Sequence, residues 1–385
     1  RTPQTGGRID PILTDADNNA TVNIVILGGT IGDETRLVSA GSNSLTSSVG
    51  NVFGGGYGPK ATVAGSTYVF IGKPDTTSYP DSSNLIKNLN QTTIIIIGNV
   101  FGGGDMGSIG FYAKTSQVDT SDFGTSNYEK IPGLSSNVSI KTSGTLITIG
   151  IENNNKTGNI YAGGRGGNLA TEISTELPET KAETLKGYAI VHGDSNLIIT
   201  GSTTGSGNIK ITGGIYGAGQ GVPEVTEPGR IDVILYAAVT GNTSINISNA
   251  NVNNVYGGGQ LSILGWYYDN DDQSIHGATN EDVNKNYRHY TGTDTKIIIN
   301  KSNVSGSVYG GGMGTTANAI SGAVGESTVI IMGGSKVSGD VYGGGNYAVV
   351  SNKLVVDRTP DDKTRAIYPK IASSDNISKA IVVIL

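Results

Sequence analysis

The sequence reads Thr328-Val-Ile-Ile-Met-Gly-Gly-Ser-Lys-Val337-Ser-Gly-Asp-Val341-Tyr-Gly-Gly-Gly345 in its last quarter. Here a run of mainly β-branched residues is followed by a turn, a single valine, a second turn and a short Val-Tyr segment that ends in three glycines. The stretch 295–312 repeats the same order. Short β-branched runs between turn residues predict strands, and repetition of one such unit predicts a solenoid.

The end of this unit occurs seven times, as an apolar β-branched residue, an aromatic residue and a glycine-rich triplet. The seven aromatic residues are Phe53, Phe101, Tyr161, Tyr216, Tyr256, Tyr309 and Tyr342. The glycines that mark the clusters are Gly54, Gly102, Gly163, Gly217, Gly257, Gly310 and Gly343. In a stack of units, we expect the β-branched residue to point into the core and the aromatic residues to form a ladder along one edge. We expect the glycines to turn the chain with positive φ and to leave a strip of surface bare of side chains.

The repeated unit predicts a coil of about 18 residues, whose strands pair in parallel with equivalents about 4.8 Å above and below. The clusters are farther apart than this, so we expect extra, degenerate coils at 66–71 and at 187–191 with 196–200. We expect insertions at 107–140, 165–186, 221–240, 261–295 and 346–379. Most insertions begin after a glycine cluster and should therefore leave from one edge of the stack. The prediction is an all-β fold, a parallel β-solenoid that forms a single domain over residues 1–385.

Composition excludes several classes of function. Charged residues make up 15% of the chain and the net charge is −6, without a basic stripe, so we expect no nucleic-acid partner. Cysteine is absent, which rules out disulfides and thiol chemistry and is compatible with an extracellular protein. No stretch reaches the roughly 18 apolar residues of a membrane helix. The sequence begins at Arg1, without an initiator Met or a recognisable signal peptide, which we interpret as a processed chain.

No motif in the sequence predicts catalysis. The three histidines are scattered, and no Ser/His/Asp or Lys/Arg constellation recurs with the repeat. Gly102-x-Gly104-x-x-Gly107 matches a dinucleotide fingerprint, but no helix is expected after it. We therefore expect no enzyme activity, no catalytic residue, no metal and no cofactor. A polysaccharide-active enzyme remains an alternative, because parallel β-helices carry such activities.

Two kinds of surface site are candidates for contact or modification. The insertion 261–295 contains Trp266, Tyr267 and Tyr268 beside several carboxylates, a composition suited to a protein interface or to glycan binding. Nine Asn-x-Ser/Thr sequons occur in the chain. The candidates for glycosylation are Asn90, Asn137, Asn242 and Asn303.

The two ends of the sequence suggest self-association. Apolar strands are expected at 21–27 and 380–385, and no polar cap is evident at either end. Uncapped strand edges pair with other chains, so we expect head-to-tail pairing of subunits into a ring or a filament. The alternative is that both strands fold back on their own chain.

The repeated Val-Tyr-Gly-Gly-Gly unit resembles the glycine-cluster β-solenoid repeats of microbial cell-surface proteins. A cysteine-free solenoid of this size also resembles the hoop-forming sheath proteins of filamentous methanogenic archaea. The resemblance implies an extracellular structural protein of the cell surface. We expect it to self-assemble head to tail and laterally, through strand edges and glycine-rich faces, into a sheath, an S-layer-like coat or a filament. The alternative is a surface adhesin that binds glycan or protein through its insertions.

Overall fold

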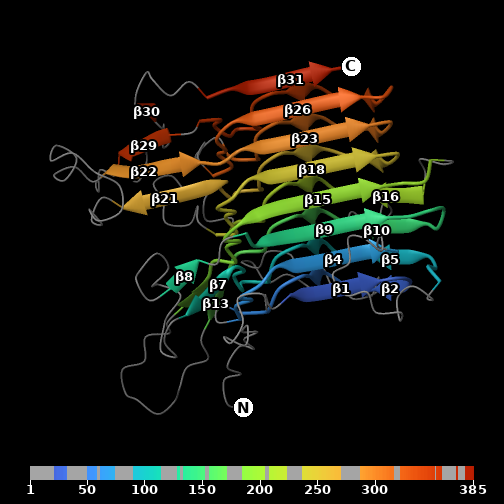
Figure 1. The fold of residues 1–385 in the computed structure, drawn as a ribbon, viewed down its shortest axis with the longest axis horizontal. Helices are drawn as coiled ribbons and strands as arrows, with labels where there is room; N and C mark the ends of the chain where they lie inside the picture. The colour runs from blue at the N-terminus through green and yellow to red at the C-terminus, as the bar shows by residue number, and fades with distance from the viewer. Residues whose placement is uncertain are drawn as a thin grey trace, which may run out of the picture.

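A computed structural model describes residues 21–32, 50–58, 61–73, 90–113, 128–130, 133–151, 156–170, 184–203, 208–222, 236–269, 287–315, 321–351, 353–357, 370–371 and 378–385. Within these residues there is no α-helix, and the strands form three long parallel sheets and three smaller antiparallel ones. Figure 1 shows the long sheets stacked from β1 at one end to β31 at the other. The fold is therefore an all-β parallel solenoid, as the repeat predicts.

A complete coil contributes one strand to each of the three long sheets. The first sheet contains β1 (Val22–Ile26), β4 (Thr67–Gly72), β9 (Ser135–Lys141), β15 (Asp194–Thr200), β18 (Thr243–Ser248), β23 (Thr295–Asn300), β26 (Ser327–Met332) and β31 (Ala380–Ile384). The second contains β2 (Gly29–Ile31), β5 (Ile94–Ile96), β10 (Ile147–Ile151), β16 (Ile209–Ile211), β19 (Asn251–Val252), β24 (Asn303–Val304) and β27 (Lys336–Val337), with β11 (Lys156–Thr157) antiparallel to β10. The third contains β3 (Val52–Phe53), β6 (Val100–Phe101), β12 (Ile160–Tyr161), β17 (Ile215–Tyr216), β20 (Val255–Tyr256), β25 (Val308–Tyr309) and β28 (Val341–Tyr342).

Each coil is completed by two further rows of single-residue bridges. The fourth row contains Tyr57, Asp105, Arg165, Gln220, Gln260, Met313 and Asn346. The fifth row contains Val63, Ile109, Val191, Val239, Leu264, Val324 and Val350. In both rows each coil contributes a single bridged residue and not a run of β-branched residues. The two rows form the part of the coil that connects the glycine cluster to the next strand of the first sheet.

The expected coil of about 18 residues is wrong, because the quoted unit covers only the part of a coil that passes through the three sheets. Thr295 pairs with Ser327, so the coil there runs from 295 to 326. The segments 66–71 and 187–200 are not extra coils. They supply strands β4 and β15 of the first sheet and the fifth-row residue Val191.

The core is a stack of aliphatic side chains between the three sheets. Inward positions alternate with outward ones along the first sheet, as in the buried Ile245 and Ile247 of β18. Six hydroxyl groups near the start of first-sheet strands are also buried, and they form hydrogen bonds across the interior of the coil. Each donates to the carbonyl that follows the aromatic residue of its own coil, as Thr243 Oγ1 does to Gly257 O at 2.6 Å. The donors are Thr67, Ser136, Ser195, Thr243, Thr295 and Ser327.

The seven aromatic rings stack in one ladder along the third sheet. Neighbouring ring centroids are 4.6–4.9 Å apart and the ring planes differ by 3–10°. Phe101 and Tyr161 in the middle of the ladder are completely buried, whereas Tyr342 at its end is 44% exposed. Such offset stacking adds to the energy of burial.

The cluster glycines have a different role from the one expected. None of them has positive φ, and those of the inner coils are buried. A Cβ on Gly219 would lie 2.5 Å from the carbonyl oxygens of Ala237 and Gly164. The glycines are therefore needed because backbones pack closely inside the stack, and they leave no bare strip on its surface. The third cluster position is glycine in all seven copies, whereas Ala162 and Ala218 occupy the first and second positions of one copy each.

The insertions leave the coil between the fourth row and the next first-sheet strand, and their strands lie on one side of the stack in Figure 1. These strands are β7 (Phe111–Ala113), β8 (Tyr128–Lys130), β13 (Gly167–Ala170), β14 (Thr184–Gly187), β21 (Gly265–Asp269), β22 (Tyr287–Gly292), β29 (Lys353–Asp357) and β30 (Lys370–Ile371). The expected boundaries were too wide. The range 107–140 includes the fifth-row Ile109 and most of β9, and the range 261–295 includes the fifth-row Leu264.

Candidate functional site

Among the residues that the structure describes, the outermost strands at the two ends of the stack have no paired strand on their outer side. At one end, β31, β27 and β28 are the outermost strands of the three long sheets, and at the other end β1, β2 and β3 are outermost. Most of the exposed large apolar side chains of the described residues gather at the β31 end. They are Tyr342, Tyr347, Ile381, Val382, Ile384 and Leu385. Apolar, unpaired edges of this kind are sites of strand addition.

The backbone groups that face away from the stack at the two ends, and that pair with no described strand, are complementary. Leu385 N–H donates to Ile331 O, so the alternation of a parallel ladder directs the N–H groups of Ala380, Val382 and Ile384 away from β26. Val22 N–H donates to Ser66 O, so the same alternation leaves the N–H groups of Asn23 and Val25 unpaired by β4. A parallel pair in which Val382 lies beside Ile24 satisfies both sets.

The β31 end is stepped. The first sheet has eight strands along its path, whereas the second and third have seven each. β31 therefore projects one strand beyond β27 and β28, while β1, β2 and β3 belong to the same coil. If β31 were placed beside β1 of a second copy, the first sheet would be continuous, and the second and third sheets would each be interrupted by one strand layer.

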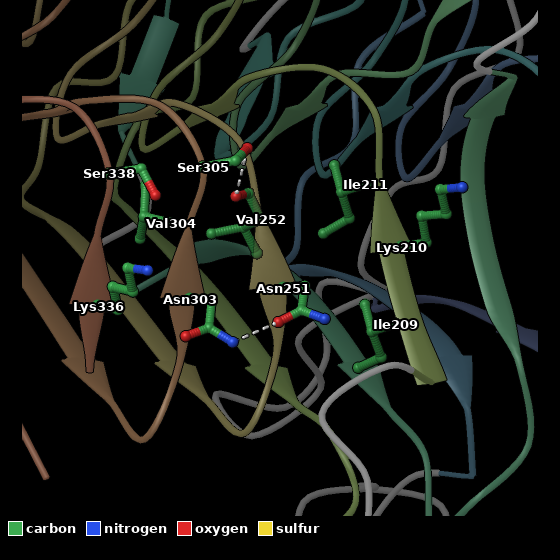
Figure 2. Close-up of a pocket in the computed structure, with 10 residues that line it drawn as sticks. All are labelled: Ile209, Lys210, Ile211, Asn251, Val252, Asn303, Val304, Ser305, Lys336 and Ser338. Atoms are coloured by element: carbon green, nitrogen blue, oxygen red, sulfur yellow. Dashed lines mark hydrogen bonds between the residues drawn. The ribbon is translucent and has the colours of Figure 1, made fainter. Parts of the chain in front are cut away.

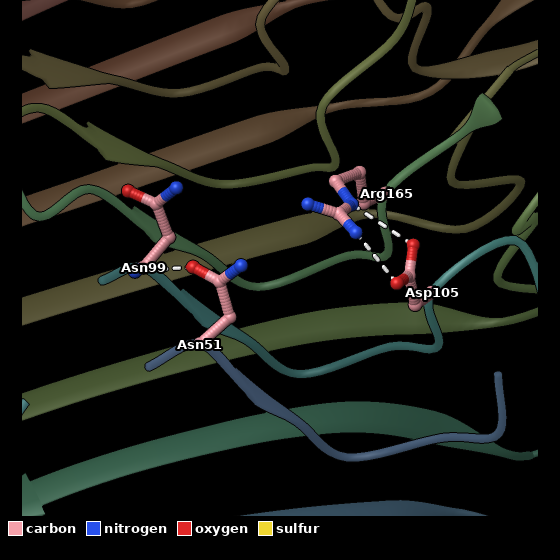
Figure 3. Close-up of polar contacts among 4 residues, drawn as sticks. All are labelled: Asn51, Asn99, Asp105 and Arg165. Atoms are coloured by element: carbon pink, nitrogen blue, oxygen red, sulfur yellow. Dashed lines mark hydrogen bonds and ion pairs between the residues drawn. The ribbon is translucent and has the colours of Figure 1, made fainter. Parts of the chain in front are cut away.

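The fourth row and the aromatic ladder form a polar network along the stack. Arg165 Nε and Nη2 donate to the two carboxylate oxygens of Asp105 at 2.9 and 2.6 Å, as Figure 3 shows. The guanidinium carbon lies 5.0 Å from the centroid of Phe53 and 6.0 Å from that of Phe101. Both members of the pair are mostly buried, so the arrangement is a bidentate ion pair shielded by aromatic rings.

The tyrosine hydroxyls extend this network. Tyr161 Oη donates to Gln260 Oε1, and Gln220 Nε2 donates to the same oxygen at 3.3 Å. Burial, reinforced by the neighbouring Tyr216, raises the pKa of Tyr161 well above its usual value. Burial, reinforced by Tyr256, likewise raises the pKa of Tyr216. The rings are therefore neutral hydrogen-bonding groups rather than proton-transfer groups near neutral pH.

An asparagine row precedes the third sheet. Asn99 N–H donates to Asn51 Oδ1 at 2.8 Å, and Asn159 N–H donates to Asn99 Oδ1 at 2.8 Å. Figure 3 shows the Asn51–Asn99 contact. Each asparagine side chain thus accepts a hydrogen bond from the backbone of the next coil, so the row stabilises the stack.

The insertion that carries Trp266, Tyr267 and Tyr268 forms part of a separate sheet. The three residues lie on β21, where they pair with Thr291, Tyr290 and His289 of β22. β22 also pairs with β29, so the insertions 261–295 and 346–379 belong to one four-stranded sheet. Sequence reasoning missed this association, because the two insertions are separated by more than one complete coil.

The four candidate glycosylation sites differ in accessibility. Asn137 is half-buried, and its Nδ2 donates to Thr67 O and Ser135 Oγ at 3.1 and 2.9 Å. Asn242 is exposed, and only its Oδ1 is used, as the acceptor for Asp294 N–H. Asn303 is exposed and its Nδ2 donates to Asn251 Oδ1, while Asn90 is exposed outside the strands. Attachment to Nδ2 is therefore compatible with the contacts of Asn90 and Asn242 and incompatible with those of Asn137.

A groove of about 510 Å³ lies on the second sheet across β16, β19, β24 and β27. Figure 2 shows Lys210 and Lys336 on either side of Asn251 and Asn303 in this groove. Among the described residues, no group of three or more His, Asp and Glu side chains is arranged to hold a metal ion. In the same part of the chain, no helix has the length and apolar character needed to cross a membrane.

The sheet order, the coil and the ladders define a parallel β-solenoid repeat protein. Comparison of the chain with protein-family models, with curated proteins and with solved structures finds no match.

Proposed function

We propose that this protein is an extracellular structural subunit that polymerises head to tail through the ends of its solenoid into a cell-surface sheath, coat or filament. The observation that carries the proposal is the complementarity of β31 and β1. Both are outermost strands of the same parallel sheet within the described part of the chain. Their backbone groups that face away from that sheet alternate in the phase that an in-register junction requires.

Side-chain chemistry at the ends also supports this assembly. Val382 and Ile384 extend the inward rows of the core, and both are exposed because no described residue lies beyond them. Burial of apolar surface stabilises an interface at roughly 25 cal/mol per Å² before the costs of association are subtracted. The head-to-tail contact is heterologous, so its repetition gives a ring or an open filament.

The glycine clusters contribute less to this interface than the strand edges do. They pack within the stack, and only the terminal cluster has open space, at Gly344. The proposed contact is therefore the first sheet, reinforced by the exposed end of the aromatic ladder at Tyr342.

The test is a proline at Val382, followed by sedimentation and negative-stain microscopy. Proline removes the N–H that faces the free edge and leaves the hydrogen bonds to β26 intact. Val382→Ile keeps that N–H and an apolar β-branched side chain, and isoleucine already occupies this row at Ile245 and Ile297, so it is the matched control. Deletion of 380–385 is less informative, because it only exposes the equivalent edge of β26.

We expect ordered polymer from the wild type and from Val382→Ile, and soluble monomer from Val382→Pro. Monomer from the wild type at high protein concentration, or polymer from Val382→Pro indistinguishable from that of the wild type, overturns the proposal.

The second candidate function is that of an adhesin. It is favoured by the four-stranded sheet that joins two insertions and carries Trp266, Tyr267 and Tyr268 on β21. Aromatic residues of this kind are frequent in binding hot spots. A glycan array tests it, with Trp266→Ala expected to weaken any genuine ligand. An array without binding, or a signal unchanged in Trp266→Ala, counts against this function.

A further inference from the structure

The outward face of the first sheet carries a row of apolar side chains. Ile198, Ile298, Ile330 and Val383 share one register position on β15, β23, β26 and β31, and Asn246 has the same position on β18. Ile198 is 45% exposed, and the other three apolar residues are partly exposed. Figure 1 shows the strands of this sheet side by side toward the viewer. This apolar row is therefore a narrow strip on the side of the stack, parallel to the stack axis.

The start of the same strands forms an acidic edge. Its members are Asp194, Asn242, Asp294 and Glu326, at the beginning of β15, β18, β23 and β26. Asn242 N–H donates to Asp194 Oδ1 at 2.8 Å, and Asp294 N–H donates to Asn242 Oδ1 at 2.9 Å. Glu326 N–H donates to Asp294 Oδ1 at 3.0 Å. These bonds hold the carboxylates of Asp194 and Asp294 in a line along the edge.

The end of these strands has a different character. The last residues of the four strands are Thr200, Ser248, Asn300 and Met332. The exposed Lys301 follows β23 directly, and the exposed Asp294 directly precedes it. The face therefore has a negative charge at one end of β23, a positive charge at the other end, and the apolar row between them.

This distribution favours one symmetric contact between two copies. A two-fold axis that runs along the stack and passes over the apolar row reverses the strands and keeps the direction of the stack. Each residue of the apolar row then faces its own counterpart, and Asp294 of each copy lies level with Lys301 of the other. A two-fold axis along the strands would instead bring the two acidic edges together, which like charges oppose.

We propose that two copies of this chain pack face to face through the first sheet, with their stacks parallel and their strands antiparallel. The contact is isologous, and two packed sheets of this kind lie about 10 Å apart. This inference deepens the proposed function, because it gives neighbouring polymers a lateral contact. The glycine clusters of the inner coils are buried, so they do not provide that contact.

The size of the face indicates how strong the contact is. The outward face from β15 to β26 measures about 24 Å along the strands and about 19 Å along the stack. Packing two such faces buries roughly 900 Å² in total, which is less than the roughly 1,200–2,000 Å² of a stable complex. The contact is therefore weak between single chains and becomes strong when a polymer repeats it.

The test is chemical cross-linking of single-cysteine variants, since the chain has no cysteine of its own. Ile298→Cys should give a covalent dimer with a short bifunctional thiol reagent, because position 298 faces itself. Lys296→Cys alone should give little dimer, since its counterpart is displaced by four residues, about 13 Å along the strand. Lys296→Cys mixed with Asn300→Cys should cross-link, because the two-fold axis places these positions opposite each other.

Charge variants of the Ile298→Cys chain test the symmetry. Asp294→Asn removes the charge and keeps the acceptor for Glu326 N–H, as Asn242 does in the same row. Lys301→Asp brings two acidic groups together. Each contact contains the Asp294–Lys301 pair twice, so either change should lower the dimer yield about threefold or more. The swap Asp294→Lys/Lys301→Asp should restore the yield, and Lys336→Asp on the second sheet is the matched control.

Circular dichroism verifies that each variant is folded, and added salt should lower the yield of the Ile298→Cys dimer. Absence of that dimer, an equal dimer from Lys296→Cys alone, or a swapped chain that cross-links no better than Lys301→Asp overturns the proposal. The head-to-tail junction by itself places Ile298 of successive copies eight strand layers, or about 38 Å, apart. It therefore gives none of these products, and failure of either contact leaves the other to its own test.

Discussion

Asn23 and Ile381 occupy the same position of the coil on the outermost strands of one sheet, separated by six intervening strands. The register runs from Asn23 through Tyr68, Asn137, Asn196, Ser244, Lys296 and Thr328 to Ile381. The two residues are roughly 34 Å apart in one chain, at about 4.8 Å per strand. In the proposed junction between two copies they become direct neighbours, which makes the register of the polymer measurable.

The first prediction uses the absence of cysteine from the chain. A mixture of Asn23→Cys and Ile381→Cys chains should form intermolecular disulfides on mild oxidation, because in-register parallel neighbours have a Cα separation compatible with a disulfide. Non-reducing electrophoresis measures the product. Asn23→Cys mixed with Val383→Cys is the control, since a shift of two residues takes the Cα atoms beyond about 7 Å. Equal cross-linking of both mixtures would mean that the junction has no fixed register.

The sequence predicts the features of the fold that follow from residue type and repetition. It does not predict the features that depend on which residues are neighbours in space. The β-branched runs and the seven Val/Ile-aromatic pairs predict strands, and their repetition predicts parallel stacking. The fourth row is formed by single residues as different as Asp105, Arg165 and Gln260, and the fifth by isolated aliphatic residues outside any β-branched run. No periodicity therefore identifies these two rows, and the coil length predicted from the sequence is too short. The Asp105–Arg165 ion pair could not be predicted either, because the sequence does not indicate which residues lie one coil apart.

The glycines illustrate the same limit. Their enrichment predicts a special backbone requirement, but φ and packing are two different reasons for glycine. The structure distinguishes the two reasons. Gly219 has an ordinary φ, and a carbonyl oxygen lies close to where its Cβ would be. Gly29, outside the clusters, has a φ of 92°, and no atom lies within 4 Å of where its Cβ would be. For the candidate site, the apolar end strands could be predicted from 21–27 and 380–385. The sequence does not indicate which backbone N–H groups of these strands face outward, nor that β31 projects one strand beyond β27 and β28.

The second prediction tests the packing role of the glycines. Gly219→Ala should destabilise the protein by about 2–3 kcal/mol, because its Cβ would overlap two carbonyl oxygens and the chain must shift to accommodate it. Gly344→Ala should change the free energy of unfolding by less than about 0.5 kcal/mol, since no atom lies within 4 Å of its Cβ position. Urea denaturation measures both. Equal effects would show that backbone flexibility, and not close approach, explains the glycines.

The third prediction concerns the buried ion pair. Asp105→Ala should cost about 3–5 kcal/mol, because it leaves the Arg165 guanidinium without its carboxylate beneath the aromatic rings. The double variant Asp105→Gln/Arg165→Gln should recover most of that loss, since Gln220 and Gln260 occupy the next two positions of the row and bond to each other. Thermal or urea unfolding gives the values. A double variant as unstable as Asp105→Ala would show that the charges themselves are required.

The fourth prediction is loss of stability at alkaline pH. The pKa values of Tyr161 and Tyr216 are raised in the folded protein, with burial the main cause. In the unfolded chain these phenols ionise near their ordinary pKa of about 10. Above that pH the unfolded state therefore binds fewer protons than the folded state. The contribution of these two phenols to stability is therefore constant below about pH 10 and falls above it, by about 1.4 kcal/mol per pH unit for each phenol that stays protonated in the folded protein.

Phenylalanine variants isolate this effect, because Phe53 and Phe101 already occupy the same position of the ladder. Tyr161→Phe should cost about 1 kcal/mol at pH 7, where the hydroxyl contact with Gln260 is lost. Above pH 10 its stability should fall less steeply than that of the wild type, so the two curves converge as the pH rises. Urea unfolding between pH 8 and 12 measures both slopes, and absorbance at 295 nm reports tyrosinate formation. Parallel curves for wild type and Tyr161→Phe would show that the buried ladder does not govern alkaline unfolding.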